Sequence, residues 1–386
     1  MKPTYRINGA AFSTSVCAVL FGLFAFAYLY FYQADLIAVS LHLLSGGTLC
    51  YHNLLGALLL TTLLLCLQRV TASLSRLPQA WHAATYFPSA LLLVALTSLS
   101  PVSRVGNVRL EGTFFLLPLL LVAYICGVAL WRRKIATNTP KFAVADNALW
   151  TNLLLLAVTM LFVGLMGTGD DVFHYRMKTE RLLLAGRKAE AQNVGQGSSS
   201  TDSSLTSLRI FTLSQTHLLG EKLFEYPLVG GSEALLPNGS SVCWLLLDEH
   251  RLGVHLSAHS LPSAPTALQR LERLASQSAI CRAAADYLLC GYLLDRKLDA
   301  FAKAIPRFYR LSDSLPRHYR EALTLYMHLR STPVVSYHDD VVDTDFRDFQ
   351  DLENKFTNRT LQQTALHDVY GSTYWYYYTF PPVSKK

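Results

Sequence analysis

The stretch WTNLLLLAVTMLFVGLMGTGDDVFHYRMK, residues 150–178, decides how this chain of 386 residues is organised. It has no charged residue up to Met166 and then gains two acids and two bases between Asp170 and Lys178. An apolar helix of about 20 residues crosses the hydrocarbon layer of a bilayer, where charged side chains are costly. The stretch therefore predicts that a membrane domain ends here and that a water-soluble domain follows.

The formal charge divides the chain at the same place. Residues 1–167 hold ten of the 34 Lys and Arg and three of the 27 Asp and Glu, which leaves 24 of each sign for residues 168–386. The whole excess of +7 therefore lies in the first part. A basic excess in the short loops of a membrane domain reports orientation in a lipid bilayer, so we expect no nucleic-acid partner.

Five segments are apolar and long enough to cross the membrane. The uncharged region 36–68 is too long to be a single transmembrane helix, because it would be about 50 Å long and the hydrocarbon layer is about 30 Å thick. We expect Ser45-Gly46-Gly47 to interrupt it, because glycine has no side chain to restrain the backbone. Residues 36–44 are then interfacial or re-entrant. The predicted spans are residues 10–32, 51–67, 86–103, 114–131 and 150–166.

The basic residues predict an orientation. Five crossings place the two ends of the chain on opposite sides of the membrane. With the N-terminus in the cytoplasm, the short outer loops hold only Arg104 and Arg109, which agrees with the positive-inside rule. The C-terminal domain is then outside the cytoplasm. The inner basic residues are Lys2, Arg6, Arg69, Arg76, Arg132, Arg133, Lys134 and Lys141.

Apolar residues recur at helical spacing through most of residues 168–386. We expect Pro265 and Pro316 in first turns and Pro306 just after a helix end. Residues 226–263 are rich in Gly, Pro and Ser and read as an insertion, in which 242–247 is a candidate strand. The predicted helices are 172–193, 203–224, 265–277, 279–296, 298–305, 316–330, 345–356 and 361–378.

A weak internal repeat supports paired helices. Residues 186–191, GRKAEA, align with residues 295–300, DRKLDA, and residues 319–322 repeat the Glu-Ala step. A tight turn followed by a small Ala resembles the turn of tetratricopeptide repeats, although the Trp and Pro landmarks of that repeat are absent. The predicted fold class is all-α, with about five transmembrane helices followed by a tetratricopeptide-like soluble domain. A helical bundle without repeats is the alternative.

One hypothesis for function is a membrane enzyme of glycosyltransferase type that acts on a lipid-linked or envelope sugar substrate. Acidic and imidazole side chains at the outer mouth of the bundle would then serve as general bases or hold a divalent ion. Helix capping and solvation explain the same residues without catalysis. The candidates are Asp35, His42, Asp170, Asp171 and His174.

The run Tyr374, Trp375, Tyr376, Tyr377 and Tyr378 is the most unusual composition in the soluble half. These rings are candidates for binding a partner, for stacking on sugars or for resting on lipid headgroups. They equally suit a helix that closes the open end of a helical-repeat domain, whose last unit must cover apolar surface.

Few patterns in the chain point to cofactor or metal chemistry. The sequence has no P-loop, no GxGxxG, no GxSxG and no HExxH, and its seven cysteines lack metal-ligand spacing. The acidic run 338–351 lacks the glycine that a calcium loop of the EF-hand type requires. We therefore expect no cofactor and no bound metal.

At FHYRMK (173–178), LGEKLFEYP (219–227) and GSTYW (371–375), the chain resembles an uncharacterised family of bacterial inner-membrane proteins. SGGT (45–48) fits the same likeness. The resemblance implies a Gram-negative inner membrane and a periplasmic helical-repeat domain, and it supplies no activity. A more distant likeness, in architecture only, is to membrane glycosyltransferases that carry tetratricopeptide repeats.

The leading hypothesis is a protein without enzymatic activity. It would be anchored in the inner membrane and bind a protein partner through its periplasmic domain, in an envelope assembly or export complex. A helical-repeat surface without a catalytic set motivates this hypothesis.

Overall fold

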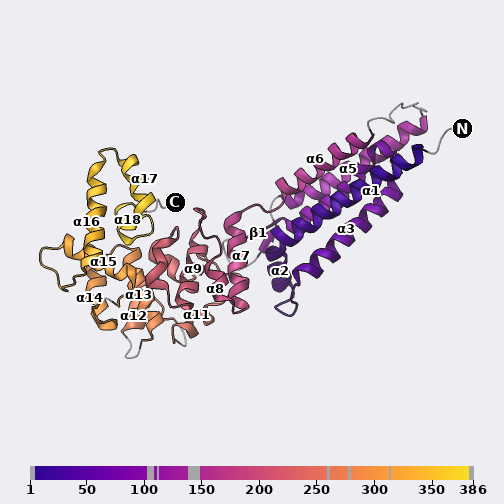
Figure 1. Cartoon of the computed structure of the whole chain (residues 1–386). Helices are drawn as coiled ribbons and strands as arrows, with labels where there is room; N and C mark the ends of the chain where they lie inside the picture. Colours follow the sequence, from indigo (N-terminus) through magenta and orange to yellow (C-terminus); the bar gives the residue numbers. More distant parts are fainter. Residues whose placement is uncertain are drawn as a thin grey trace. The chain divides into compact units, whose positions relative to one another are not determined.

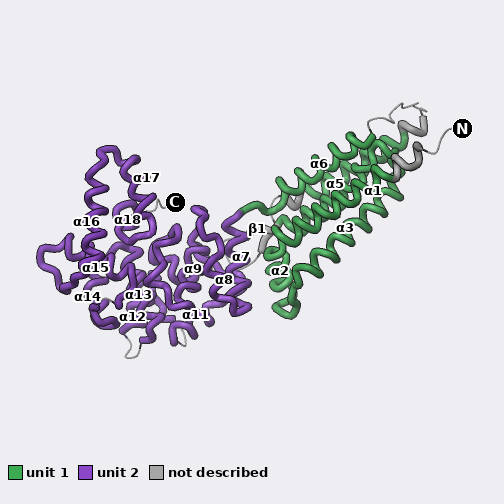
Figure 2. Tube along the Cα trace, viewed as in Figure 1, with its two compact units in different colours: residues 1–102, 107–170 green, residues 103–106, 171–386 purple. Residues whose placement is uncertain are grey.

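The computed structural model describes residues 5–101, 108–110, 113–137, 148–258, 261–276, 280–312 and 314–381. The chain splits into two compact units, coloured green and purple in Figure 2. The first unit contains residues 1–102 and 107–170. The second contains residues 103–106 and 171–386.

The first unit is a bundle of apolar helices (Figure 1). Its only strands in the described part of the chain are two short ones that pair antiparallel, with Leu99 opposite Leu110. The elements are α1 (Tyr5–Ala27) with a π-helical turn (Tyr28–Tyr32), α2 (Ala34–Leu44), α3 (Asn53–Ser75), a 3₁₀ helix (Gln79–Tyr86), α4 (Phe87–Thr97), β1 (Leu99–Pro101), β2 (Val108–Leu110), α5 (Thr113–Thr137) and α6 (Ala148–Met166).

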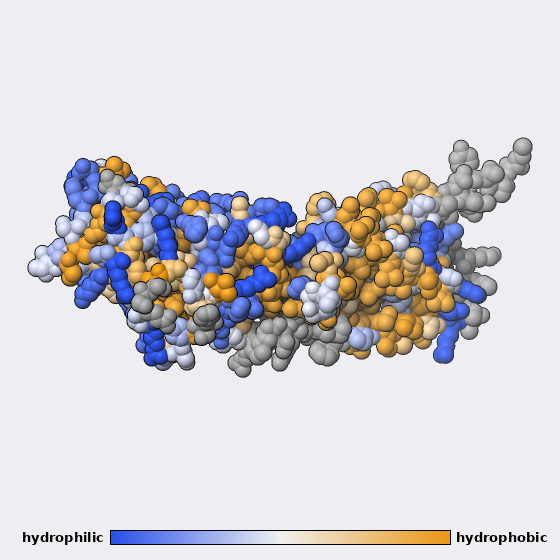
Figure 3. Space-filling view, turned by 90° about the horizontal axis from the view of Figure 1, so that it is seen from below, coloured by the Kyte–Doolittle hydropathy of each residue, from blue (hydrophilic) through white to orange (hydrophobic). Residues whose placement is uncertain are grey.

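Five helical segments in the described residues are long and apolar enough to cross a membrane. On the face drawn in Figure 3, apolar residues cover most of this unit. The prediction of a multispanning helical domain followed by an all-α region is confirmed. The segments are Phe12–Tyr32, Asn53–Ser75, Gln79–Thr97, Leu116–Arg133 and Ala148–Met166.

The third of these segments begins and ends earlier than the predicted span 86–103. Its early start is held by Asn152 of α6, which is completely buried. Its side-chain oxygen accepts a hydrogen bond from the Ala83 amide at 2.8 Å, and its nitrogen donates to the carbonyls of Gln79 and Ala148 at 2.8 and 2.9 Å. Asn152 thereby satisfies backbone groups of the 3₁₀ helix that the bundle would otherwise leave unpaired.

The break expected within residues 36–68 is present. Helix α2 is short and buries Leu36 and Val39 against the bundle. The chain then turns through Gly46 and Gly47, whose φ angles of +60° and +84° favour glycine.

Basic residues mark the C-terminal ends of α3 and α5. They include Arg69, Arg76, Arg132 and Arg133, and Figure 3 shows hydrophilic residues at that end of the bundle. Lys2, Arg104 and Lys141 lie outside the described residues, as do the side chains of Arg6, Arg109 and Lys134.

Helices are the regular elements of the second unit in its described residues, and irregular loops connect them. Figure 1 shows α16 and α17 as a hairpin with α18 beside it. The elements are α7 (Asp171–Leu184), α8 (Lys188–Gln192), α9 (Ser203–Gln215), α10 (Leu219–Lys222), two 3₁₀ turns (Leu223–Glu225 and Gly231–Leu235), α11 (Glu249–His255), α12 (Ala267–Ala275), α13 (Arg282–Leu294), α14 (Leu298–Phe308), α15 (Arg317–Leu329), α16 (Asp340–Lys355), α17 (Arg359–Tyr370) and α18 (Tyr374–Thr379).

Three helix pairs of this unit, α7–α8, α9–α10 and α13–α14, share one turn. Its central residue is Gly186, His217 or Arg296, with φ of +72°, +59° and +56°. A left-handed residue followed by an amide that reaches back five residues is the Schellman helix end. Those bonds join Arg187 N to Leu182 O, Leu218 N to Leu213 O and Lys297 N to Tyr292 O, at 2.9, 2.8 and 2.8 Å.

These turns correct several predicted helices. Each of the helices expected at 172–193 and 203–224 is two helices, because the chain reverses at Gly186 and His217. Pro265 precedes its helix, which Thr266 caps instead. Pro306 lies inside the last turn of α14 rather than after it, and the helix ends two residues later.

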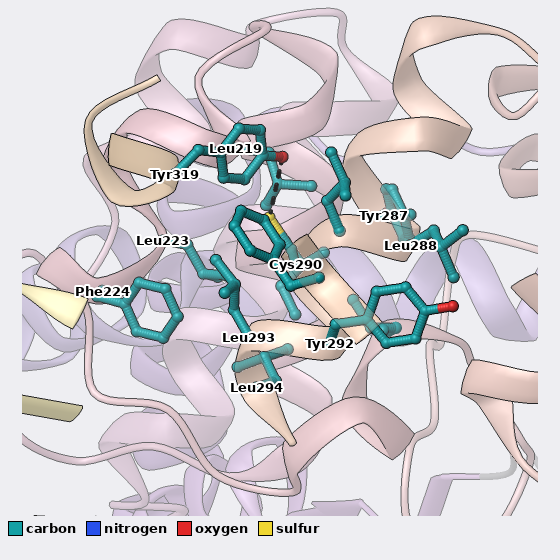
Figure 4. Packing of buried hydrophobic residues seen from close by; sticks show 14 of the residues in the cluster. Leu219, Leu223, Phe224, Tyr287, Leu288, Cys290, Tyr292, Leu293, Leu294 and Tyr319 are labelled. Carbon is teal, nitrogen blue, oxygen red and sulfur yellow. Dashed lines mark hydrogen bonds between the residues drawn. The ribbon is translucent and has the colours of Figure 1, made fainter. Parts of the chain in front are cut away.

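The core of the second unit forms around α13. Figure 4 shows Cys290 and Leu293 of α13 among Leu219, Leu223 and Tyr319, which come from the neighbouring helices. The Cys290 sulfur lies 3.5 Å from the Tyr319 hydroxyl. Burial raises the pKa of the Cys290 thiol, so this cysteine packs as an apolar side chain and is not reactive.

The Asn152 contacts make a testable prediction. Asn152→Leu removes the acceptor of the Ala83 amide and the side-chain donor to the Gln79 carbonyl in an apolar bundle, which costs about 2 kcal/mol. Cys17 of the same unit is fully buried, so it reacts with a maleimide only when the bundle opens. We expect it to react about 30-fold faster in Asn152→Leu than in the unchanged protein. Labelling of the detergent-solubilised full chain would be measured by peptide mass spectrometry. Thr62→Leu, on the exposed face of α3, is the control. Equal labelling of Cys17 in both variants would contradict this account.

Candidate binding groove

A groove of about 1040 Å³ opens in the second unit between a serine-rich loop and the C-terminal helices. Val172 of α7 and three segments line it: loop 197–203, segment 224–229, and the C-terminal part formed by α17, α18 and the residues that follow them. We name it the serine–tyrosine groove. It is lined by Val172, Gly197, Ser198, Ser199, Ser200, Thr201, Asp202, Ser203, Phe224, Glu225, Tyr226, Pro227, Leu228, Val229, Gln363, His367, Gly371, Tyr376, Tyr377, Phe380 and Pro381.

Arg209, in the middle of α9, holds the serine loop in place. Its side chain is buried, and its neighbours in the sequence are apolar. The guanidinium donates to the Thr201 hydroxyl at 3.2 Å and to the carbonyls of Pro227 and Gly195 at 3.3 and 3.5 Å. It also lies over the Tyr226 ring, 5.3 Å from the ring centre. One buried arginine therefore ties two of the three lining segments together.

Arg176 of α7 fixes the end of the same loop. Its guanidinium is 3.2 Å from the Asp202 carboxylate and donates to the Cys243 carbonyl at 2.8 Å. Asp202 in turn accepts the Leu205 amide at 2.6 Å and so caps α9.

The aromatic side of the groove depends on Glu321 of α15. Its side chain is buried, and its carboxylate accepts the Tyr374 amide at 2.7 Å and the Arg317 Nε at 2.8 Å. The Trp375 indole donates to the Glu321 backbone carbonyl at 2.8 Å. Helix α18 therefore begins on a buried carboxylate, which favours the positive end of a helix.

His318 extends this network to the third lining segment. The Phe224 amide donates to His318 Nε2 at 3.3 Å, and His318 Nδ1 lies 2.9 Å from the Glu321 carboxylate. The ring proton is thus on Nδ1, which donates to Glu321. Phe224 also packs edge-on against the His318 ring, with 5.0 Å between ring centres.

The aromatic run predicted as a partner-binding surface divides in two. Tyr374 and Trp375 are 0% and 2% exposed and belong to the core, so they are not available to a partner. Tyr376, Tyr377 and Tyr378 are partly exposed, and the first two line the groove. The run therefore closes the helical core with one face and contributes to the groove with the other.

Of the five candidates for an enzyme site, two lie on α2, two on α7, and Asp170 just before α7. Asp35 and His42 are half-buried on α2, two turns apart, or about 10 Å along the helix. Asp170 and Asp171 are exposed, and His174 follows on the first turn of α7, within reach of the Asp171 face. Among the described residues, no three His, Cys, Asp or Glu side chains are grouped as metal ligands.

A second buried carboxylate, Glu180 of α7, organises residues 242–247. It is completely buried and accepts the amides of Leu245, Leu246 and Leu247 at 2.8, 2.5 and 3.3 Å. The strand expected at 242–247 is therefore wrong, because these amides bond to a side chain rather than to a neighbouring strand. Burial raises the pKa of Glu180 to about 7, although the amides and Arg176 favour its ionised form.

The buried charges that hold the groove and the neighbouring loops in place were not among the candidate site residues named from the sequence. Arg176, Glu180, Arg209 and Glu321 are charged residues on buried helix faces. Their one sequence signal is a charge on an otherwise apolar face, as in LRIFTL around Arg209. That signal does not say which distant segment the charge binds.

Comparison with known proteins reaches only part of the chain. Residues 254–381 match the model of a family of unknown function (DUF6057). The match covers about a third of the chain and lies within the second unit, from the end of α11 to α18. No curated protein and no solved structure matches the chain. The match agrees with the resemblance to an uncharacterised family.

The Glu321 network predicts how α18 is attached. Glu321→Ala leaves the Tyr374 amide and His318 without their acceptor, at a cost of about 2–3 kcal/mol. We expect the amides of residues 374–380 to exchange with deuterium roughly 30- to 100-fold faster in the full chain. Asp351→Ala, at an exposed acid of α16, should leave them unchanged. Unchanged exchange in Glu321→Ala would show that α18 is attached by other contacts.

Glu180 predicts a pH dependence with a defined sign. Its pKa in the fold, about 7, lies above its ordinary value of 4.5. Its contribution to stability is therefore fully present below about pH 4.5 and is lost as the pH rises through 7. We expect the free energy of opening at the Leu245–Leu247 amides, from hydrogen exchange, to fall by up to about 3 kcal/mol between pH 4.5 and 8.

Glu180→Gln should abolish this slope because glutamine does not titrate. Glu190→Gln, at an exposed residue of α8, should keep it. The same slope in all three proteins would assign the pH dependence to another group.

Proposed function

We propose that this chain is a membrane-anchored binding protein without enzymatic activity, whose second unit takes a protein partner in the serine–tyrosine groove. In this proposal the membrane is a bacterial inner membrane, the N-terminus is cytoplasmic, and the second unit is a periplasmic, tetratricopeptide-like domain. The partner belongs to an envelope assembly or export complex.

The groove is the observation that carries the proposal. Its volume of about 1040 Å³ is at the upper end of the range for small-molecule sites, which favours a ligand that extends beyond one metabolite. Its sides are fixed in advance by Arg209 and Glu321, so little ordering is needed on binding. The repeated Schellman turns at Gly186, His217 and Arg296 support a domain of stacked helical pairs.

The five apolar helices support membrane anchoring, and the arginines at the ends of α3 and α5 support the orientation. The enzyme hypothesis gains no comparable support. Asp35 and His42 form one pair on α2, and Asp171 and His174 another on α7, without a metal-ligand group among the described residues.

Photo-crosslinking in intact cells tests the partner. A benzoylphenylalanine at position 376, inside the groove, should yield a discrete protein adduct of the full chain. The same group at position 369, on the exposed face of α17, is the matched control. Absence of an adduct at 376, or the same adducts from both positions, would overturn the proposed role of the groove.

Reporter fusions test the orientation separately. Alkaline phosphatase fused after Lys386 should be active, and green fluorescent protein at the same point should be dark, because each reports one side of the membrane. The reverse pattern would place the second unit in the cytoplasm and remove the envelope partner from the proposal.

A further inference from the structure

The charge of the serine–tyrosine groove limits what can occupy it. Its lining includes two carboxylates, Asp202 and Glu225, and each faces an arginine: Arg176 at 3.2 Å and Arg317 at 3.8 Å. No Lys or Arg is among the lining residues. The groove therefore offers no net positive charge to a phosphate or an acidic segment and no unpaired carboxylate to a basic one, which favours an uncharged ligand.

Among the tyrosines of the groove, Tyr376 and Tyr377 are partly exposed, and Tyr226 is buried with Arg209 over its ring. The Tyr226 hydroxyl donates to the Gln192 carbonyl at 3.1 Å, and the Tyr377 hydroxyl donates to the Leu294 carbonyl at 2.9 Å. Tyr376 packs against Phe380, with ring centres 5.3 Å apart. Rigid aromatic faces of this kind bind the rings of proline residues in extended segments.

The opposite side of the groove is rich in hydroxyl groups. Ser198, Ser199, Ser200, Thr201 and Ser203 lie on one irregular loop, and Ser199 and Ser200 are exposed. Hydroxyls donate readily to carbonyl oxygens. A polyproline II segment exposes all its carbonyls, lacks donors at each proline and is already extended before it binds, so it suits this side and loses little entropy.

From this chemistry we infer that the groove binds an uncharged, proline-rich segment of its partner in the polyproline II conformation. The inference rests on the proposed function and narrows it to one class of ligand. An oligosaccharide fits less well, because the two groove carboxylates that would accept its hydroxyls are already occupied by Arg176 and Arg317.

Binding of a labelled decaproline peptide to the detergent-solubilised full chain tests the inference by fluorescence anisotropy. A Gly-Ser peptide of equal length is the reference probe, and maltoheptaose is the sugar competitor. We expect decaproline to bind at least tenfold more tightly than the Gly-Ser peptide. Tyr376→Ala should weaken its binding tenfold or more, because the ring that stacks on proline is lost.

Two further variants make the outcome independent of folding. Ser199→Trp should block the groove from its other side, and Val369→Ala, outside the groove, should bind normally. Equal binding of the two peptides, or decaproline binding that survives both groove variants, would overturn the inference, as would displacement of decaproline by maltoheptaose. A crosslinked adduct at position 376 without decaproline binding would leave the proposed function standing and remove only this inference.

Discussion

The groove depends on one buried carboxylate, that of Glu321 on α15. A charge in an apolar core is stable only where donors surround it, and here two donors come from the preceding turn of α15 and one from a distant part of the chain. They are the Tyr374 amide, the Arg317 guanidinium and the His318 ring, and His318 passes the connection on to the Phe224 amide. The first residue of α18 and a segment about 150 positions earlier are thus fixed to one point. Without that point, the aromatic helix would have no defined place beside the serine loop.

In both units, single buried polar side chains hold irregular backbone segments in place. In the first unit, Asn152 bonds to two backbone groups of the 3₁₀ helix and one in the first turn of α6, and so holds the start of the third apolar segment. In the second unit, Arg209 and Glu180 do the same for two irregular loops. Each is a single polar side chain in an apolar setting, and its loss would leave several partners unsatisfied at once. The irregular segments keep one conformation because such a side chain binds them.

The parts of the fold that could be predicted are those whose signal is local. A run of about 20 apolar residues identifies a span on its own, and Gly46-Gly47 identifies a break. The extent of the third span could not be predicted, because it depends on an Asn about 70 residues away. His217 hid one helix end, since it is not the glycine that normally marks a left-handed turn, whereas the end at Gly186 was missed although it has that glycine. In the groove, the aromatic run 374–378 was visible from composition. Which of its rings are buried and which line the groove could not be predicted, because that depends on the distant Glu321.

The account's central claim is that the groove exists before any ligand binds, because buried charges fix both of its sides. The most direct measurement is the distance between spin labels on Ser199 and Gln363, two exposed residues that line the groove from opposite segments. The labels would be introduced through unnatural amino acids in the ligand-free full chain and read by pulsed electron resonance. The account predicts one narrow distance distribution. A broad or bimodal distribution would show that the two sides are not fixed relative to each other and would contradict it.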